Sequence, residues 1–289
     1  MELWQKTAGK QLSLMGFPGG ICSLLREKDG ITVCRVRFGD RQLVLKHFSG
    51  EEDRREIENY RILNRLGIQT IPLIAHTDQA ILLEDMESSP QYRLGIPQDL
   101  DDLQVTASLA AWYRMLHDRG RSYVKKYGSL LYDETDLITR ESISLTAIQS
   151  ATESAPVWEF LRQRFDDVMT GIRSAERTLT YNDFYYTNLV VSKDKAEAFM
   201  FDYNLLGKGY VLSDLRNVTY HMNETAAQAF LTAYGSYDKD EILIDRVASA
   251  LTSLIFACRR EEWPEWADEP LDKVRSGELL QDVEQLLNK

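Results

Sequence analysis

Residues 21–48 read ICSLLREKDGITVCRVRFGDRQLVLKHF, three runs of apolar and β-branched residues separated by two short turns. The turns, Lys28-Asp29-Gly30 and Gly39-Asp40, contain the residue types that reverse a chain tightly. Such runs with so little chain between them predict a three-stranded antiparallel meander.

The segments that follow extend this pattern into a small lobe. Residues 51–66 carry apolar side chains at helical spacing behind an acidic first turn, which predicts one amphipathic helix. The runs IPLIAH (71–76) and AILLEDM (80–86), joined by the polar residues 77–79, predict two more strands. The expected order of elements is therefore β-β-β-α-β-β.

The character of the chain changes after Glu87-Ser88-Ser89-Pro90, because helical patterns then dominate. Helices are expected within 101–118, 155–175 and 223–258, and a lone hairpin is expected at 189–202. We predict an α+β protein with a small antiparallel-sheet lobe, residues 1–88, a hinge at about 84–88, and a larger, mostly helical lobe, residues 89–289.

Composition narrows the classes of function. The 289 residues are 44% apolar, enough for a sizeable core, and the net charge is 34 − 45 = −11. This charge opposes binding to nucleic acid or to an anionic membrane. It would suit a cationic substrate, but the simpler explanation is that a negative surface keeps a protein dissolved. No apolar run reaches the about 20 residues of a membrane span, and no signal peptide is visible, so a cytoplasmic location is expected. The three cysteines and four histidines show no metal-ligand spacing.

The segment 179–191, LTYNDFYYTNLVV, carries the clearest chemistry. Asp183 and Asn188 precede the expected hairpin, and Asp202 follows it in Phe-Asp-Tyr. Phosphoryl transfer needs a carboxylate to orient the acceptor hydroxyl and oxygen ligands to hold Mg²⁺ on the nucleotide phosphates. These three side chains can supply both.

The first lobe offers two further groups. Lys46 lies near the end of the third expected strand, where its ammonium could reach phosphates, and Glu58 follows on the expected helix. We expect Glu58 to pair with Lys46 and hold it extended.

With these residues in place, the chain resembles the aminoglycoside phosphotransferase and choline kinase family, which has a protein-kinase-like bilobal fold. The resemblance extends from the Lys28-Asp29-Gly30 turn to Asp214. It implies binding of ATP and Mg²⁺, with Asp183 as catalytic base and with Asn188 and Asp202 as metal ligands. Lys46 and Glu58 match the family's phosphate-binding Lys and helix Glu.

The resemblance also assigns positions around the nucleotide. ILLEDM, residues 81–86, is similar to the segment whose backbone receives adenine, which makes Glu84 and Met86 the expected hinge residues. Gly30 is the single glycine of the phosphate loop, so nucleotide binding is expected to depend more on Lys46 and the metal. Asp214 matches a buried Asp of the family, which would cap a helix or brace the catalytic loop.

One departure concerns the catalytic loop. The family usually has His-Gly-Asp there, whereas this chain has Tyr181-Asn182-Asp183. The base is kept, and Asn tolerates positive φ better than most residues, so the loop can hold its shape. We expect Tyr181 to change packing rather than chemistry.

Three functions follow in order of preference. The first is a kinase acting on a hydroxyl of a small molecule such as an aminoglycoside, choline or ethanolamine. The second is a catalytically lapsed nucleotide-binding scaffold, suggested by the altered loop. The third is a protein kinase, which residues 203–213 disfavour because they are too short for a peptide-binding activation segment. The identity of the acceptor and the oligomeric state stay open at this point.

Overall fold

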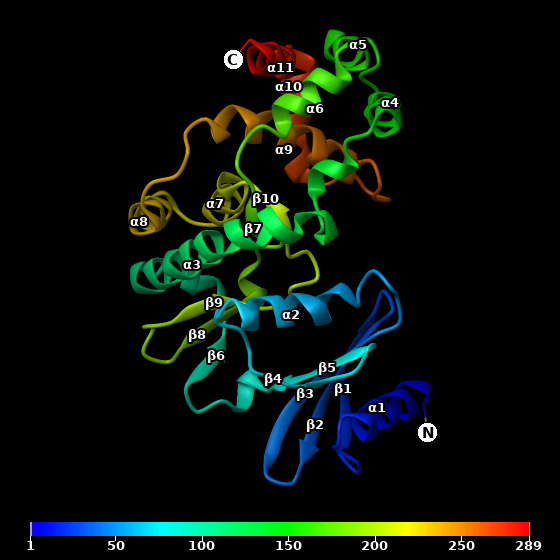
Figure 1. The fold of residues 1–289 in the computed structure, drawn as a ribbon, viewed down its shortest axis with the longest axis vertical. Coiled ribbons are helices and arrows are strands. Elements are labelled where there is room, and N and C mark those ends of the chain that lie inside the picture. The colour runs from blue at the N-terminus through cyan, green and yellow to red at the C-terminus, as the bar shows by residue number, and fades with distance from the viewer. Residues whose placement is uncertain (1, 289) are drawn as a thin grey trace. The chain divides into compact units, whose positions relative to one another are not determined.

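The computed structural model describes residues 2–288, and it divides the chain into two compact units (Figure 1). The first unit comprises Met1–Gly120, Tyr181–Leu206 and Asn217–Gly235; the second comprises Arg121–Thr180, Gly207–Arg216 and Ser236–Lys289. Across residues 2–288, no helix combines the length and the apolar character that crossing a bilayer needs.

A five-stranded antiparallel sheet forms the start of the first unit, with strand order β1-β2-β3-β5-β4. Its strands are β1 (Ile21–Lys28), β2 (Ile31–Phe38), β3 (Arg41–Phe48), β4 (Leu73–His76) and β5 (Ala80–Glu84). Asp29 and Gly30 both have positive φ, 52° and 78°, as the two-residue turn between β1 and β2 requires. The predicted meander is therefore confirmed.

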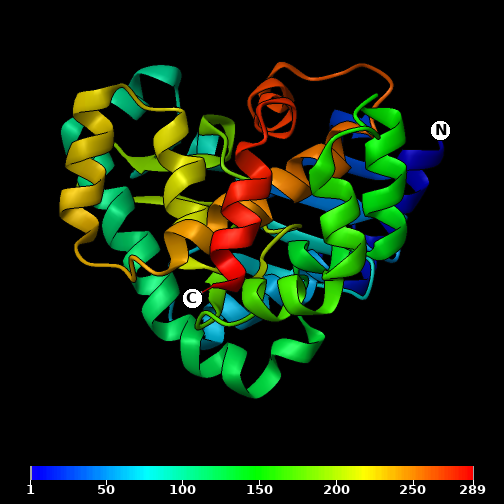
Figure 2. The same cartoon turned by 90° about the horizontal axis from the view of Figure 1, so that it is seen from above.

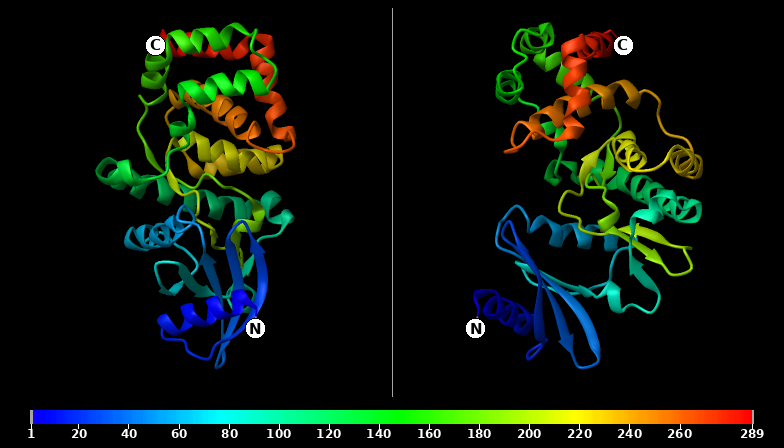
Figure 3. Two further views of the ribbon diagram at one scale, coloured as in Figure 1. Left: turned by 90° about the vertical axis from the view of Figure 1, so that its right-hand side faces the viewer. Right: turned by 180° about the vertical axis from the view of Figure 1, so that it is seen from behind.

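Two helices flank this sheet. Helix α2 (Arg55–Arg65) lies where the sequence predicts a helix, so the β-β-β-α-β-β order is confirmed. Helix α1 (Leu3–Leu14), which was not predicted, precedes it and lies beside the strands in Figure 3. Ala8 and Leu12 of α1 pack with Cys34 on β2 and with Leu43 and Leu45 on β3.

The rest of the first unit holds a second, smaller sheet and a helical part. Strand β6 (Tyr92–Leu94) joins the expected hairpin, β8 (Leu189–Ser192) and β9 (Ala198–Met200), so the predicted lone hairpin is corrected to a three-stranded sheet. Helix α8 (Glu224–Tyr234) ends at Gly235, whose φ of 90° stops the helix there. Two helices contribute residues to both units: α3 (Leu103–Tyr127) and α7 (Val211–Tyr220).

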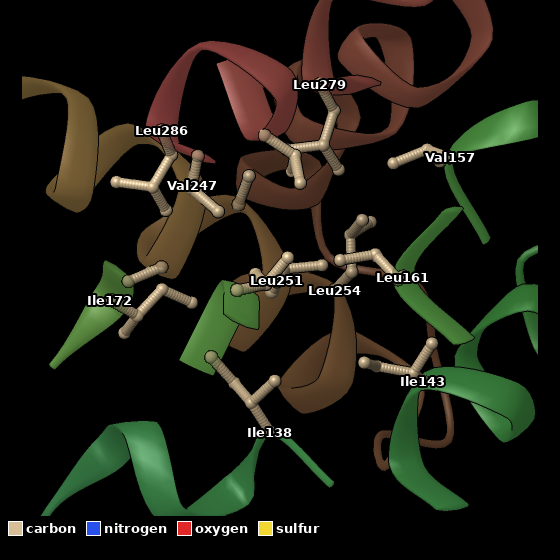
Figure 4. Packing of buried hydrophobic residues seen from close by; sticks show 14 of the residues in the cluster. Ile138, Ile143, Val157, Leu161, Ile172, Val247, Leu251, Leu254, Leu279 and Leu286 are labelled. Atoms are coloured by element: carbon tan, nitrogen blue, oxygen red, sulfur yellow. The ribbon is translucent and has the colours of Figure 1, made fainter. Parts of the chain in front are cut away.

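The second unit is mostly helical, with one short strand pair, β7 (Thr178–Thr180) and β10 (Gly207–Gly209). Its helices are α4 (Arg140–Gln149), α5 (Pro156–Gln163), α6 (Phe165–Ile172), α9 (Glu241–Ala257), α10 (Asp268–Ser276) and α11 (Glu278–Leu287). Figure 2 shows α11, in red, beside the green helices α5 and α6. Figure 4 shows the apolar core, where Leu251 and Leu254 of α9 meet side chains from the surrounding helices.

The predicted α+β fold class is confirmed, with an antiparallel sheet near the N-terminus and a mostly helical remainder. The predicted boundaries of the helices are less accurate than the predicted fold class. The stretch 155–175 contains two helices that meet at Arg164, and 223–258 contains two helices separated at Gly235. The predicted division at residue 88 into two lobes stays a prediction.

Candidate active site

Lys46 occupies the face of the large sheet opposite to α1. Side chains alternate along a strand, so Leu45 points toward α1 while Lys46 points to the other face. There the ammonium donates to a carboxylate oxygen of Glu56 on α2, at 2.6 Å. It also donates to a carboxylate oxygen of Asp202, at 2.6 Å. A strand, a helix and a loop of the first unit thus meet at one nitrogen atom.

The predicted pair of Lys46 with Glu58 does not form, and Glu56 takes the place expected for Glu58. The side chain of Glu56 is 1% exposed, whereas that of Glu58 is 48% exposed and pairs with Arg61. Two residues along an α-helix correspond to about 200° of rotation, so the two carboxylates lie on opposite sides of α2. Glu56 shares its side with the buried Tyr60 and Leu63.

Burial and charge act against each other in this group. Burial disfavours the charged ammonium, yet the carboxylates of Glu56 and Asp202 outweigh it, and the pKa of Lys46 lies above its ordinary value. Burial likewise raises the pKa of Glu56, although the Lys46 ammonium opposes this. An ion pair this deeply buried adds little net stability, because desolvation offsets much of the attraction.

Asp183 lies in a loop whose backbone depends on unusual φ angles. Asn182 has a φ of 67° and Asp202 a φ of 63°, both in the left-handed region. The Asn182 side-chain amide donates to the carbonyl of Leu205 at 2.9 Å, which fixes this conformation. The structure therefore agrees with the expectation that Asn can replace a glycine before Asp183.

The electrostatic environment of Asp183 suits a base. Burial, together with the charge of Asp202, raises the pKa of this carboxyl to about 6, although Lys46 opposes the shift. The side-chain amide of Asn188 donates to the Asp183 backbone carbonyl at 3.3 Å and makes a longer contact of 3.5 Å with its carboxylate. Asp183, Asn188, Asp202 and Lys46 consequently form one connected group.

Tyr181 serves packing, as the sequence predicts. Its ring is fully buried and meets Trp112, Tyr113 and Tyr203 edge-on. Its hydroxyl donates to the carbonyl of Phe201, next to Asp202. Tyr181 thereby links the loop that carries Asp183 to the loop that carries Asp202.

Sequence reasoning missed Glu56 and Asn59. Asn59 is 4% exposed, and its amide donates to the carbonyl of Tyr203 at 2.7 Å, which ties α2 to the loop after Asp202. A signal was present, because Glu56 and Asn59 fall three positions apart on the side of the helix that also carries Leu63. Polar residues on an otherwise apolar helix side indicate specific partners.

The other predicted residues lie outside the hydrogen-bonded Lys46 group. Gly30 lies in the β1–β2 turn, and its carbonyl accepts from the Ser49 amide at 2.9 Å. Glu84 ends β5, and the buried Met86 begins a 3₁₀ turn, Met86–Ser88. The roles of Gly30, Glu84 and Met86 in nucleotide binding stay predictions.

Asp214 belongs to the second unit, in the first turn of α7, and is 1% exposed. The N-terminal amide of Leu212 in this helix donates to the carboxylate of Glu241 at 2.9 Å. Glu241 therefore caps that amide of α7, and helix capping by Asp214 stays a prediction. The bracing of the catalytic loop by Asp214 stays a prediction.

The predicted metal ligands fit a magnesium ion. Carboxylate and amide oxygens, here from Asp202 and Asn188, are hard ligands, and Mg²⁺ typically takes one or two carboxylates plus substrate phosphates. The Lys46 ammonium pairs with the carboxylates of Glu56 and Asp202, and the charge of Asp202 also acts on Asp183, so a further cation would relieve the repulsion between Asp183 and Asp202. Among residues 2–288, no three His, Cys, Asp or Glu side chains form a group that could hold a metal by themselves.

Comparison with known proteins supports the fold. The macrolide 2'-phosphotransferase MphH from Brachybacterium faecium matches with a TM-score of 0.60 and 15% identity, over 93% of this chain and 97% of that chain. The choline kinase LicA from Streptococcus pneumoniae matches with a TM-score of 0.60 and 15% identity, over 97% of this chain and 100% of that chain. A spectinomycin phosphotransferase, APH(9)-Ia, solved with ADP and spectinomycin, matches with a TM-score of 0.58 and 11% identity, over 97% and 98%.

No family model and no curated protein matches the sequence itself. At these identities the likeness concerns the fold, and the predicted resemblance is confirmed at that level. The chain has the kinase-like α+β fold found in these phosphotransferases and choline kinases.

Proposed function

We propose that this protein is a phosphotransferase that moves the γ-phosphate of ATP to a hydroxyl group of a small molecule. The observation that carries the proposal is the group around Lys46. Its ammonium binds the carboxylates of Glu56 and Asp202, and the charge of Asp202 raises the pKa of Asp183. A cation for phosphates, a carboxylate for a metal and a base of raised pKa are the parts that phosphoryl transfer needs.

Each residue has a distinct part in the reaction. Lys46, held by Glu56, donates to oxygens of the phosphate chain. Asp183 orients the acceptor hydroxyl and takes its proton as the acceptor oxygen bonds to the γ-phosphorus and the bond to the β-phosphate oxygen breaks. Asp202 and Asn188 would hold Mg²⁺, which, when bound, neutralises charge on the β- and γ-phosphates.

Two considerations support ATP as the phosphate donor and a hydroxyl-bearing small molecule as the acceptor. The structural neighbours are named for macrolide, choline and spectinomycin as substrates, and one was solved with ADP. A hydroxyl-bearing small molecule is therefore the acceptor class, and ATP the phosphate donor. The net charge of −11 favours an acceptor with a positive charge.

The test is transfer of labelled γ-phosphate from ATP to a panel of aminoglycosides, choline, ethanolamine, amino alcohols and neutral sugars. We expect at least one acceptor to be phosphorylated, and Asp183→Asn to slow single-turnover transfer by about 100- to 10,000-fold. Asp78→Asn, an exposed aspartate in the turn between β4 and β5, is the matched control and should leave the rate unchanged.

Two results would contradict the proposal. One is stabilisation of the protein by Mg-ATP without transfer to any hydroxyl compound, which would support the nucleotide-binding scaffold instead. The other is a normal rate in Asp183→Asn. Phosphorylation of neutral sugars only would contradict the preference for a cationic acceptor.

A further inference from the structure

Arg35 on β2 faces the same side of the large sheet as Lys46. Lys46 pairs with Val33 across the β2–β3 ladder, and Arg35 is two residues further along β2. Because side chains alternate, residues two apart share a face, so Arg35 lies about 7 Å along the strand from the row of Lys46. Arg35, Val44 and Leu83 pair across β2, β3 and β5 and form the neighbouring row on that face.

The guanidinium of Arg35 reaches the segment after β5, where the hinge is expected. Its Nε donates to the carboxylate of Asp85 at 2.6 Å, and one Nη donates to the carboxylate of Glu87 at 2.5 Å. Asp85 is 4% exposed, and its other oxygen accepts from the Glu87 amide at 3.1 Å. Asp85 thus positions Arg35, whereas the carboxylate of Glu87 is largely exposed.

The direction in which a nucleotide extends from Lys46 follows from burial. On one side of Lys46, the ring of Phe48 is fully buried, and the ammonium lies 5.5 Å from its centroid. On the other side, Val44 is half-buried and the side chain of Arg35 is 29% exposed. The accessible end of this face is therefore the row of Arg35.

We propose that Arg35 contacts the nucleobase of the phosphate donor and, with Glu87, sets the purine preference of the site toward guanine. The inference rests on the proposed function, since it takes the phosphates to lie at Lys46, and it adds GTP to ATP as a donor, bound more tightly than ATP. The base then lies at the row of Arg35. There it faces the charged groups of Arg35 and Glu87 in addition to apolar side chains.

The chemistry of the two purines gives the direction of the preference. Guanine presents two acceptors, O6 and N7, which an arginine can contact with two parallel hydrogen bonds. It also presents N–H groups, which can donate hydrogen bonds to a carboxylate such as that of Glu87. Adenine has an amino donor in place of O6, so the guanidinium can make only one of its two bonds. A guanine nucleotide therefore uses this pair of residues more fully.

The experiment measures the dissociation constants of the magnesium complexes of GTP, ATP and tripolyphosphate. Tripolyphosphate has the phosphates but no base, so it reports on Lys46 and the proposed metal ligands without any contact to a base. Arg35→Met keeps the length of the side chain and removes its donors; Arg35→Lys keeps the charge and removes the paired donors. Arg61→Met is the matched control, because Arg61 is also ion-paired but lies on the exposed side of α2 with Glu58.

We expect wild-type protein to bind GTP more tightly than ATP. Arg35→Met and Arg35→Lys should weaken GTP binding by about tenfold, weaken ATP binding less, and leave tripolyphosphate binding unchanged. Arg61→Met should change none of the three. Melting temperatures recorded without ligand identify any variant that fails to fold, and Arg35→Lys then carries the comparison.

Three outcomes would overturn the inference: tighter binding of ATP than GTP by wild-type protein, an unchanged GTP-to-ATP ratio in both Arg35 variants, or an equal loss of tripolyphosphate binding. These results leave phosphotransferase activity intact and so differ from a failure of the proposed function. That failure would appear as no binding of any of the three ligands, or as binding without phosphate transfer.

Discussion

The Lys46 group and the core of the second unit differ in how each uses burial. Around Lys46, burial encloses an ammonium and the carboxylate of Glu56, at a cost in desolvation, while the paired Asp202 side chain is 32% exposed. In the second unit, burial encloses aliphatic side chains such as Leu251 and Leu254, which stabilises the fold directly. Under the proposed function, the first region serves chemistry and the second serves stability, and substitutions can separate the two.

Apart from Asp183→Asn, the largest effect is expected at Lys46. Lys46→Met removes the donor that faces the phosphates, and phosphate transfer should fall by about 100- to 1000-fold. Single-turnover kinetics at saturating Mg-ATP measure this. A rate within a few-fold of wild type, in a protein with an ordinary melting curve, would show that the buried ion pair is structural only.

The opposite result is expected in the second unit. Leu254→Ala empties part of a fully buried site and should lower the free energy of unfolding by about 2–5 kcal/mol. Urea titration measures the loss, and nucleotide affinity well below the unfolding midpoint should stay at its wild-type value. If affinity fell as strongly as stability, the separation of chemistry from stability would be wrong.

Two glutamates on one helix sharpen the comparison within the first unit. Glu56→Gln weakens the hold on Lys46, and transfer should slow by about tenfold to 100-fold, because displaced catalytic groups lose rate steeply. Glu58→Gln, at an exposed position, should leave rate and stability nearly unchanged. Steady-state kinetics of both variants check this, and equal losses would contradict the assignment of Glu56.

The pH dependence follows from Asp183. Its pKa is raised to about 6, and a base acts in its deprotonated form, so activity is present above this pH and lost as the pH falls through it. We expect kcat/KM to decrease by about tenfold per unit below pH 6. A profile that stays flat down to pH 5 would argue against Asp183 as the base.

The smallest effect is expected at Asn182. Asn182→Gly relieves the positive φ but loses the hydrogen bond to Leu205, so stability should change by less than about 1 kcal/mol. Asn182→Ala keeps the strain and loses the bond, and should cost about 2 kcal/mol. Urea titrations compare the two, and equal stabilities would show that the φ angle is unimportant.

Much of the site could be predicted because its residues follow short-range rules. The alternation of β3 places Lys46 opposite Leu45, and the spacing of Asp183, Asn188 and Asp202 around a hairpin follows from the chain itself. The sequence did not show as readily whether Glu56 or Glu58 pairs with Lys46. Both are glutamates near the start of one helix, and only the side of α2 that meets the sheet distinguishes them.

Local patterns were enough to predict the meander, the amphipathic helix and the residue types of the site, since turns, alternation and helical periodicity depend on neighbouring residues. Which of these groups meet became known from the folded chain. Lys46 and Asp202 are far apart in the chain, Asn59 finds the carbonyl of Tyr203, and Arg35 reaches Asp85. Such pairings depend on how strands and loops pack in three dimensions, and a one-dimensional pattern does not contain that information.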